Sequence, residues 1–142
     1  MPTRDQIVSE ARKHLGTRFH HQGRAPGAGL DCLGLVVVTA RALGIEMLDR
    51  SDYHRDPDGV SLVREIGRSL DGPFNLSEKR IGSVILFQFL LDLPQHVAIY
   101  AGDNIIIHSI AVSPRKVCEM RLSDEWLKRA VSVWEFRGVT DR

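Results

Sequence analysis

The order of the periodic segments along the chain constrains its fold more than any other feature. Apolar residues first recur at helical spacing, within residues 3–15, 31–43 and 62–70. Short runs rich in Val, Ile, Phe and Tyr then follow, separated by turn residues, at 83–89, 96–101, 105–109, 117–120 and 131–136. Helices followed by strands predict an α+β fold in which N-terminal helices pack on a central antiparallel β-sheet.

Capping residues mark the ends of the expected helices. Thr3 and Gln6 have the spacing of a capping box, and Gly16 stops the first helix. Asp31 is a good N-cap for the second helix, which Gly44 ends. The residues that we expect on the buried helix faces are Ile7, Val8, Ala11, Leu15, Leu35, Val36, Ala40, Leu43, Leu62, Val63, Ile66 and Leu70.

The segments between the periodic ones are rich in turn residues. Residues 17–30 hold four glycine or proline positions and predict a loop, and residues 49–57 are polar and turn-rich. Asp71-Gly72-Pro73 is the expected terminator of the third helix. A short helix over residues 123–129 is expected to pack Trp126 and Leu127.

Composition excludes several classes of protein. The 142 residues are enough for one domain, expected to span residues 1–142. With 19 basic and 18 acidic residues the formal net charge is +1, so we expect no nucleic-acid partner. No apolar run approaches the ~20 residues that span a bilayer, so we expect no membrane partner. The first residues resemble no signal peptide, which predicts synthesis in the cytoplasm and free thiols at Cys32 and Cys118.

Cys32 directly follows the expected N-cap Asp31 and is therefore the first residue of the second helix. Unpaired N–H groups and the helix dipole favour an anion at that position. We therefore expect the pKa of the Cys32 thiol to fall from ~8.5 toward ~7 or below, which enriches the reactive thiolate. The alternative is a core thiol, which would be favoured for a cysteine that stands alone.

Two histidines supply what a nucleophilic cysteine needs, a base and a group that orients the base. The stretch QHVAIYAGDNIIIHS places His96 and His108 on one candidate hairpin. Side chains alternate between the two faces of a sheet. His96 and His108 therefore share a face only if the sequence numbers of any two residues paired directly across the hairpin add up to an even number. A three-residue loop over 101–103 that pairs Tyr100 with Asn104 satisfies this condition and places His108 diagonally near His96.

A zinc site is an alternative for the same residues. Its candidate ligands are Cys32, His96, His108, Cys118, His20 and His21. They include no closely spaced pair such as Cys-x-x-Cys, so we expect neither a metal nor another cofactor. We interpret His14 and His54 as surface residues, and Trp126 and Trp134 as core anchors.

Four segments in a fixed order resemble one family. Residues 31–36 read Asp-Cys-x-Gly-Leu-Val, and residues 96–108 read His-x-x-x-Tyr-x-Gly-Asp-(x)4-His. GTRFHHQGRAPGAGLDC is similar to a Gly-Thr-Pro-Tyr loop before a nucleophile, and IGSVILF to a Gly-Asp-Val-Leu-Phe strand. At these positions, which extend over residues 5–137, the chain resembles the NlpC-type cell-wall peptidases, papain-related cysteine endopeptidases of bacteria and phages. It is most similar to the short stand-alone members of phage-tail clusters and gene transfer agents.

The resemblance implies a papain-like NlpC-type fold with a Cys-His-His triad. Cys32 is then the nucleophile, His96 the general base and His108 the group that orients His96, through a nitrogen that faces the His96 Nδ1–H. The implied substrate is the peptidoglycan stem peptide, cut between γ-D-glutamyl and the diamino acid. Phage-tail-like proteins are the other implied partners.

The resemblance also implies a site for the oxyanion, and here the chain departs from the family. Phe19 stands where many members have a tyrosine whose hydroxyl helps to hold the oxyanion. The Cys32 backbone N–H must then act with another donor. The candidate oxyanion or substrate-binding residues are His20, His21, Gln22 and Asp31. Ser83 replaces the family's aspartate in a turn, and we expect residues 17–30 and 49–57 to set specificity.

Two other functions remain open from the sequence. One is a structural tail-assembly component that keeps the peptidase fold with weak or no peptidase activity. The other is an acyltransferase or amidase on the same fold. For the peptidase, we expect action at the cell wall after delivery by a phage-like particle or after lysis.

Overall fold

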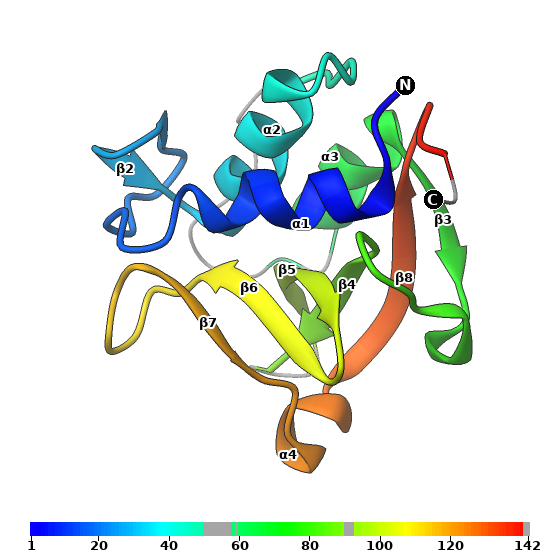
Figure 1. The fold of residues 1–142 in the computed structure, drawn as a ribbon. Helices are drawn as coiled ribbons and strands as arrows, with labels where there is room; N and C mark the ends of the chain where they lie inside the picture. The colour runs from blue at the N-terminus through cyan, green and yellow to red at the C-terminus, as the bar shows by residue number, and fades with distance from the viewer. Residues whose placement is uncertain (50–57, 59, 90–92, 141–142) are drawn as a thin grey trace.

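Helices cover one face of a six-stranded sheet in the computed structural model, which describes residues 1–49, 58, 60–89 and 93–140 (Figure 1). Figure 1 shows α1, α2 and α3 on one side of the sheet and α4 on the other. No described helix is long and apolar enough to cross a membrane. The elements in chain order are α1 (Arg4–Arg12), β1 (Arg24–Ala25), β2 (Gly29–Leu30), α2 (Cys32–Ala42), α3 (Ser61–Ser69), β3 (Leu70–Phe74), the 3-10 helix η1 (Leu76–Glu78), β4 (Val84–Gln88), β5 (Pro94–Gly102), β6 (Ile105–Ser109), β7 (Val117–Arg121), α4 (Asp124–Leu127) and β8 (Ala130–Phe136).

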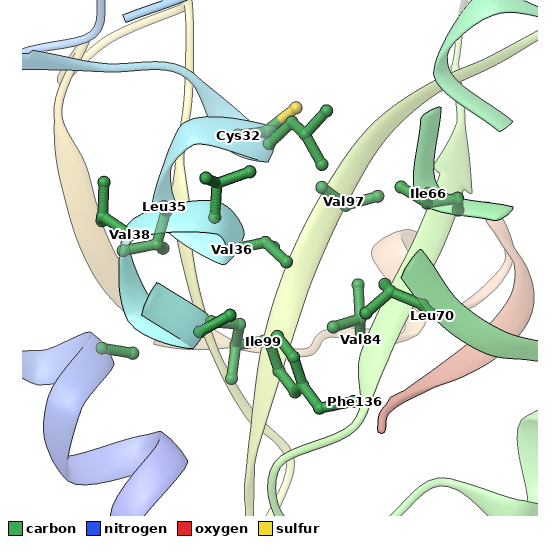
Figure 2. Packing of buried hydrophobic residues seen from close by; sticks show 14 of the residues in the cluster. Cys32, Leu35, Val36, Val38, Ile66, Leu70, Val84, Val97, Ile99 and Phe136 are labelled. Carbon is green, nitrogen blue, oxygen red and sulfur yellow. The ribbon is translucent and has the colours of Figure 1, made fainter. Parts of the chain in front are cut away.

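Alternating side chains divide the core into two clusters, one on each face of the sheet. The strand order is β3-β8-β4-β5-β6-β7, and every neighbouring pair is antiparallel, as predicted. Val84 and Leu86 pack in the larger cluster with the helices, whereas Ile85 and Phe87 pack in the smaller cluster on the other face. Figure 2 shows side chains of α2 against Val97 in the larger cluster.

The predicted caps of the first two helices are confirmed, but the end of the first helix is not. Thr3 and Gln6 form the capping box, Asp31 caps α2, and Gly44 adopts φ +74°. However, α1 ends at Arg12, and 3-10-type bonds follow from the N–H groups of His14 to Ala11 and of Leu15 to Arg12. The tighter turn rotates the side chains, so His14 is buried and Leu15 is 45% exposed, opposite to our expectation.

The predicted terminator of the third helix is part of a strand instead. The helix α3 ends at Ser69, and Leu70 begins β3, which pairs with β8 at the edge of the sheet. Pro73 is tolerated there because an edge strand leaves half of its N–H groups unpaired in any case.

Three further expectations need correction or lie outside the described residues. The predicted loop over 17–30 contains the short hairpin of β1 and β2. Leu127 is 38% exposed rather than packed. Of the polar segment 49–57, only Asp49 is among the described residues, and His54 is not.

Candidate active site

Asp31 joins the start of α2 to the loop before it. Its Oδ1 accepts a hydrogen bond from the Gly34 N–H at 2.7 Å, which is the predicted N-cap bond. Its Oδ2 accepts from the Gln22 N–H at 2.8 Å, and the Arg24 guanidinium donates to Oδ1 at 3.0 Å. The buried carboxylate therefore holds the loop on the first turn of the helix that carries Cys32.

Arg24 extends this network to Asp49. Its Nε and Nη2 donate to the two oxygens of Asp49 at 2.7 and 3.1 Å, which is a bidentate pair. Both carboxylates and most of the guanidinium are shielded from solvent. Sequence reasoning gave Arg24 no role, because nothing in the pattern relates a loop arginine to two distant carboxylates.

The β5–β6 hairpin places both histidines on one face, but through a register that differs from the predicted one. Tyr100 pairs with Ile106 rather than with Asn104. Asp103 and Asn104 form the turn with positive φ, which Asp and Asn tolerate, so Gly102 pairs with Ile105. That pairing alone would place the histidines on opposite faces. A bulge between Tyr100 and Gly102 adds one residue and restores the even sum.

His96 and His108 form a direct hydrogen bond. His96 Nε2 and His108 Nδ1 are 2.8 Å apart. The expected use of His96 Nδ1 for this contact is wrong, and the difference matters because Nδ1 is then the nitrogen left to face other groups. His108 is completely buried, as expected for the end of a strand that is apolar on both faces.

Cys32 and His96 open onto the same cleft, which has a volume of about 410 Å³. Figure 2 shows the Cys32 sulfur at the margin of the larger cluster, directed away from Val36. Backbone N–H groups of Val97 and Leu33 interact with the sulfur, so the thiol lies beside the residue that follows His96. The remaining lining residues are Phe19, His21, Asp31, Asp58, Ser61, Leu62, Phe89, Pro94, Gln95, Ile110, Ala111, Val112 and Trp126.

The structure places only two of the four candidate oxyanion and substrate-binding residues in the cleft. His21 and Asp31 line the cleft, as does Phe19. His20 is exposed and Gln22 donates its N–H to Asp31, and neither residue lines the cleft. Asp31 is engaged by donors from the loop and the helix, so its observed contacts are structural.

The electrostatics of the site differ from our expectation. Burial, with the Asp31 carboxylate beside it, raises the pKa of the Cys32 thiol to about 12 instead of lowering it. Burial and the neighbouring His108 hold the pKa of His96 well below its usual range, and burial lowers the pKa of His108 to about 4. In this state of the protein the site therefore contains a neutral thiol and two neutral imidazoles.

Trp126 is a site residue that sequence reasoning assigned to the core. Its ring lies 5.7 Å from the His96 ring and 5.0 Å from the His108 ring, centroid to centroid, both nearly edge-to-face. Phe89, also missed, lies 4.7 Å from Trp126 and 6.4 Å from His96. No sequence pattern could have found them, because the sheet order brings α4 to the histidines.

The described residues contain no group of three or more His, Cys, Asp and Glu side chains that could hold a metal ion. Both cysteines are free: Cys32 is buried at the start of α2 and Cys118 is half-buried in β7. The zinc alternative therefore gains no support from the part of the chain that the structure describes.

A cysteine at a helix N-terminus, with a histidine pair on an antiparallel sheet, defines a papain-like α+β protein. The chain belongs to the NlpC/P60 family, which its residues 16–135 match. Among solved structures, an NlpC/P60 family protein from Bacillus cereus ATCC 10987 is similar with a TM-score of 0.70 and 23% identity. That match covers 93% of this chain and 39% of the other, and it confirms the predicted fold class.

Two curated relatives are similar over most of this chain. The tail tip assembly protein K of Escherichia phage lambda is 33% identical over 132 residues, 88% of this chain and 60% of that protein. The gamma-DL-glutamyl hydrolase of Bacillus subtilis (strain 168) is 28% identical over 123 residues, 84% of this chain and 27% of that protein. The chain thus spans less than two thirds of the length of either relative. The predicted similarity to phage-tail members is confirmed by the first of them.

Proposed function

We propose that this chain is a cysteine endopeptidase that hydrolyses the peptidoglycan stem peptide. The observation that carries the proposal is the His96–His108 hydrogen bond of 2.8 Å, whose His96 lines the same cleft as Cys32. A nucleophile, a base and an orienting group in one cleft are what acyl transfer through a thioester needs. Family membership and the name of the Bacillus subtilis relative support hydrolysis of a peptide-like bond.

The proposed reaction begins from the neutral pair. The Cys32 Sγ attacks the carbonyl carbon of the substrate while its proton passes to His96 Nδ1, since Nε2 is bonded to His108. The oxyanion is held by the Cys32 backbone N–H, which has no partner within the helix, and by His21 as the second donor. His96 then protonates the leaving amine and a thioester forms. Water, deprotonated by His96, hydrolyses the thioester and restores the thiol.

The proposed scissile bond joins γ-D-glutamyl to the diamino acid. Digestion of purified peptidoglycan, followed by mass spectrometry of the soluble fragments, tests it directly. We expect fragments that begin with the diamino acid, and none from the Cys32→Ala variant. Fragments cut at another bond would contradict the proposed specificity. Intact peptidoglycan with the folded wild-type protein would contradict the proposed hydrolysis itself.

A role in tail assembly is the second candidate, favoured by the similarity to tail tip assembly protein K. We propose that phage-tail-like proteins are partners and that a phage-like particle delivers the chain to the cell wall. A scaffold role depends on the surface, so Cys32→Ala should leave binding to tail proteins unchanged. An acyltransferase or amidase would instead give products with a different amine or a different cut, which the same fragment masses reveal.

A further inference from the structure

The proposed function places a strict demand on the protonation of the histidine pair. His96 can take the Cys32 proton at Nδ1 only if its own ring hydrogen is on Nε2. That hydrogen is then donated to His108 Nδ1, at the observed 2.8 Å. His108 must therefore carry its ring hydrogen on Nε2. In the opposite arrangement His108 donates, and His96 presents an N–H instead of a lone pair to the thiol.

The required His108 Nε2–H lies in an unusual environment. The Nε2 atom is buried, and no described residue offers it a nitrogen or oxygen partner. An unpaired buried N–H costs about 1–3 kcal/mol. Without compensation, nothing in the described part of the chain favours the required tautomer over the opposite one.

Trp126 lies where that compensation can arise. Its ring is 5.0 Å from the His108 ring with an interplanar angle of 74°, an arrangement in which the edge of one ring meets the face of the other. The face of an aromatic ring carries negative potential, which attracts an N–H and repels a lone pair. Phe87 and Phe89 hold Trp126 in place, at centroid distances of 5.3 and 4.7 Å.

We propose that Trp126 is a positioning residue for the histidine pair. Its indole ring receives the His108 Nε2–H and so selects the tautomer in which His96 presents a lone pair to Cys32. This inference rests on the proposed function for its purpose, but the tautomer can be measured without any substrate.

The first test is 15N NMR of the imidazole nitrogens in the wild-type protein and in two Trp126 variants. We expect His108 to be protonated on Nε2 and not on Nδ1 in the wild type and in Trp126→Phe, which keeps a ring. Trp126→Leu should give a mixture of both tautomers. Trp134→Phe is the control, because Trp134 is buried in the larger cluster away from the histidines. Protonation of wild-type His108 on Nδ1, or a Trp126→Leu protein that keeps the single tautomer, would overturn the inference.

The second test separates positioning from a merely structural role. Trp126→Leu should lower kcat by about tenfold in the wild-type background, because most molecules would then carry the tautomer in which His96 offers no lone pair to Cys32. In a His108→Gln background an amide oxygen accepts from His96 and no ring tautomer exists, so the same change should lower kcat by less than about threefold. Equal losses in both backgrounds would contradict the inference. If the wild type cuts no peptidoglycan but its tautomers respond as stated, the proposed function fails and the role of Trp126 stands.

Discussion

At the scale of single residues, the protonation state of Cys32 decides how the site works. Burial raises the pKa of its thiol to about 12 and lowers the pKa of His96. Both shifts oppose a resting thiolate–imidazolium pair. In the proposed reaction these shifts favour deprotonation during attack on a bound substrate, rather than before it as the helix position alone would indicate.

Alkylation of Cys32 should show this directly. We expect iodoacetamide to modify Cys32 slowly at pH 7 and about tenfold faster for each pH unit, without a plateau below about pH 10. His96→Ala should change the rate at pH 7 by less than about threefold, because neutral His96 holds no ion pair. The measurement is mass spectrometry of the modified peptide in a Cys118→Ala background. A plateau below pH 8 that disappears in His96→Ala would instead reveal an ion pair.

Substitutions in the triad should have graded effects on peptidoglycan hydrolysis. Cys32→Ser and His96→Ala should each reduce kcat by more than about 10³-fold, because they remove the nucleophile and the proton acceptor. His108→Ala should keep measurable activity, reduced by about 10²-fold, and His108→Gln or His108→Asn should keep more, because the amide can still accept from His96 Nε2.

Each triad variant needs a thermal melt to show that it is folded. If folded His108→Ala were as inactive as Cys32→Ser, His108 would have to transfer protons itself, contrary to its assigned role of orienting His96.

Spacing in the sequence predicted that Cys32, His96 and His108 lie close together, but it did not predict their surroundings. Cys32, His96 and His108 lie in local patterns, a helix start and a hairpin, whose geometry follows from a few neighbouring residues. The contacts of Trp126 depend instead on β8 lying next to β4 and on the folding of α4 beneath the sheet. The high pKa of the thiol likewise depends on burial by distant segments, which no local pattern contains.

At the scale of elements, the contact between the 17–30 loop and the first turn of α2 fixes the position of Cys32, the proposed nucleophile. The Asp31 carboxylate accepts hydrogen bonds from Gln22 in the loop and from Gly34 in the helix. Gly34 lies so close to the loop that a Cβ atom there would be 2.1 Å from the Gly23 carbonyl oxygen. The glycine two residues after Cys32 is thus needed for close packing of backbone on backbone, which explains its place in the Asp-Cys-x-Gly pattern.

Gly34→Ala should therefore damage stability and activity together. The added methyl group must displace the loop or the first turn of α2, which should lower the free energy of unfolding by about 1–3 kcal/mol. Urea denaturation measures this change, and fragment release from peptidoglycan should fall as Cys32 moves. Gly67→Ala is the matched control, because this α3 glycine has nothing within 4 Å of its Cβ position. It should stabilise the protein by about 0.5–1 kcal/mol. A Gly34→Ala protein as stable as the wild type would refute the close packing.

Most helices and strands could be predicted from periodicity, whereas the joints between them could not. The β5 and β6 runs were evident, but their register depends on a bulge between Tyr100 and Gly102 that no alternation pattern reveals. Periodicity does not predict β3, because Asp71-Gly72-Pro73 disfavours a strand locally, and pairing with the distant β8 stabilises it there. His14 is buried in place of Leu15 because 3-10-type hydrogen bonds follow the end of α1 and rotate these side chains around the helix axis.

At the scale of the whole molecule, the candidate active site lies where the two core clusters meet. Cys32 comes from the larger cluster, and His96 and His108 contact the aromatic rings of the smaller one. His108 is therefore completely buried, whereas His96 is half-buried and lines the cleft. Protonation of these rings therefore lowers the free energy of unfolding of the domain.

The free energy of unfolding should therefore fall as the pH is lowered from about 6.5 to about 4. In the unfolded chain histidine binds a proton near pH 6.5, whereas in the folded protein burial lowers the pKa of His108 to about 4. Between these values the unfolded state binds more protons, so the stability present above pH 6.5 is lost on acidification, by about 3 kcal/mol from His108 alone. Urea denaturation at a series of pH values measures the slope. His108→Gln should flatten it, while His20→Gln, in an exposed loop residue, should not. A slope unchanged by His108→Gln would mean that His108 is protonated equally in both states.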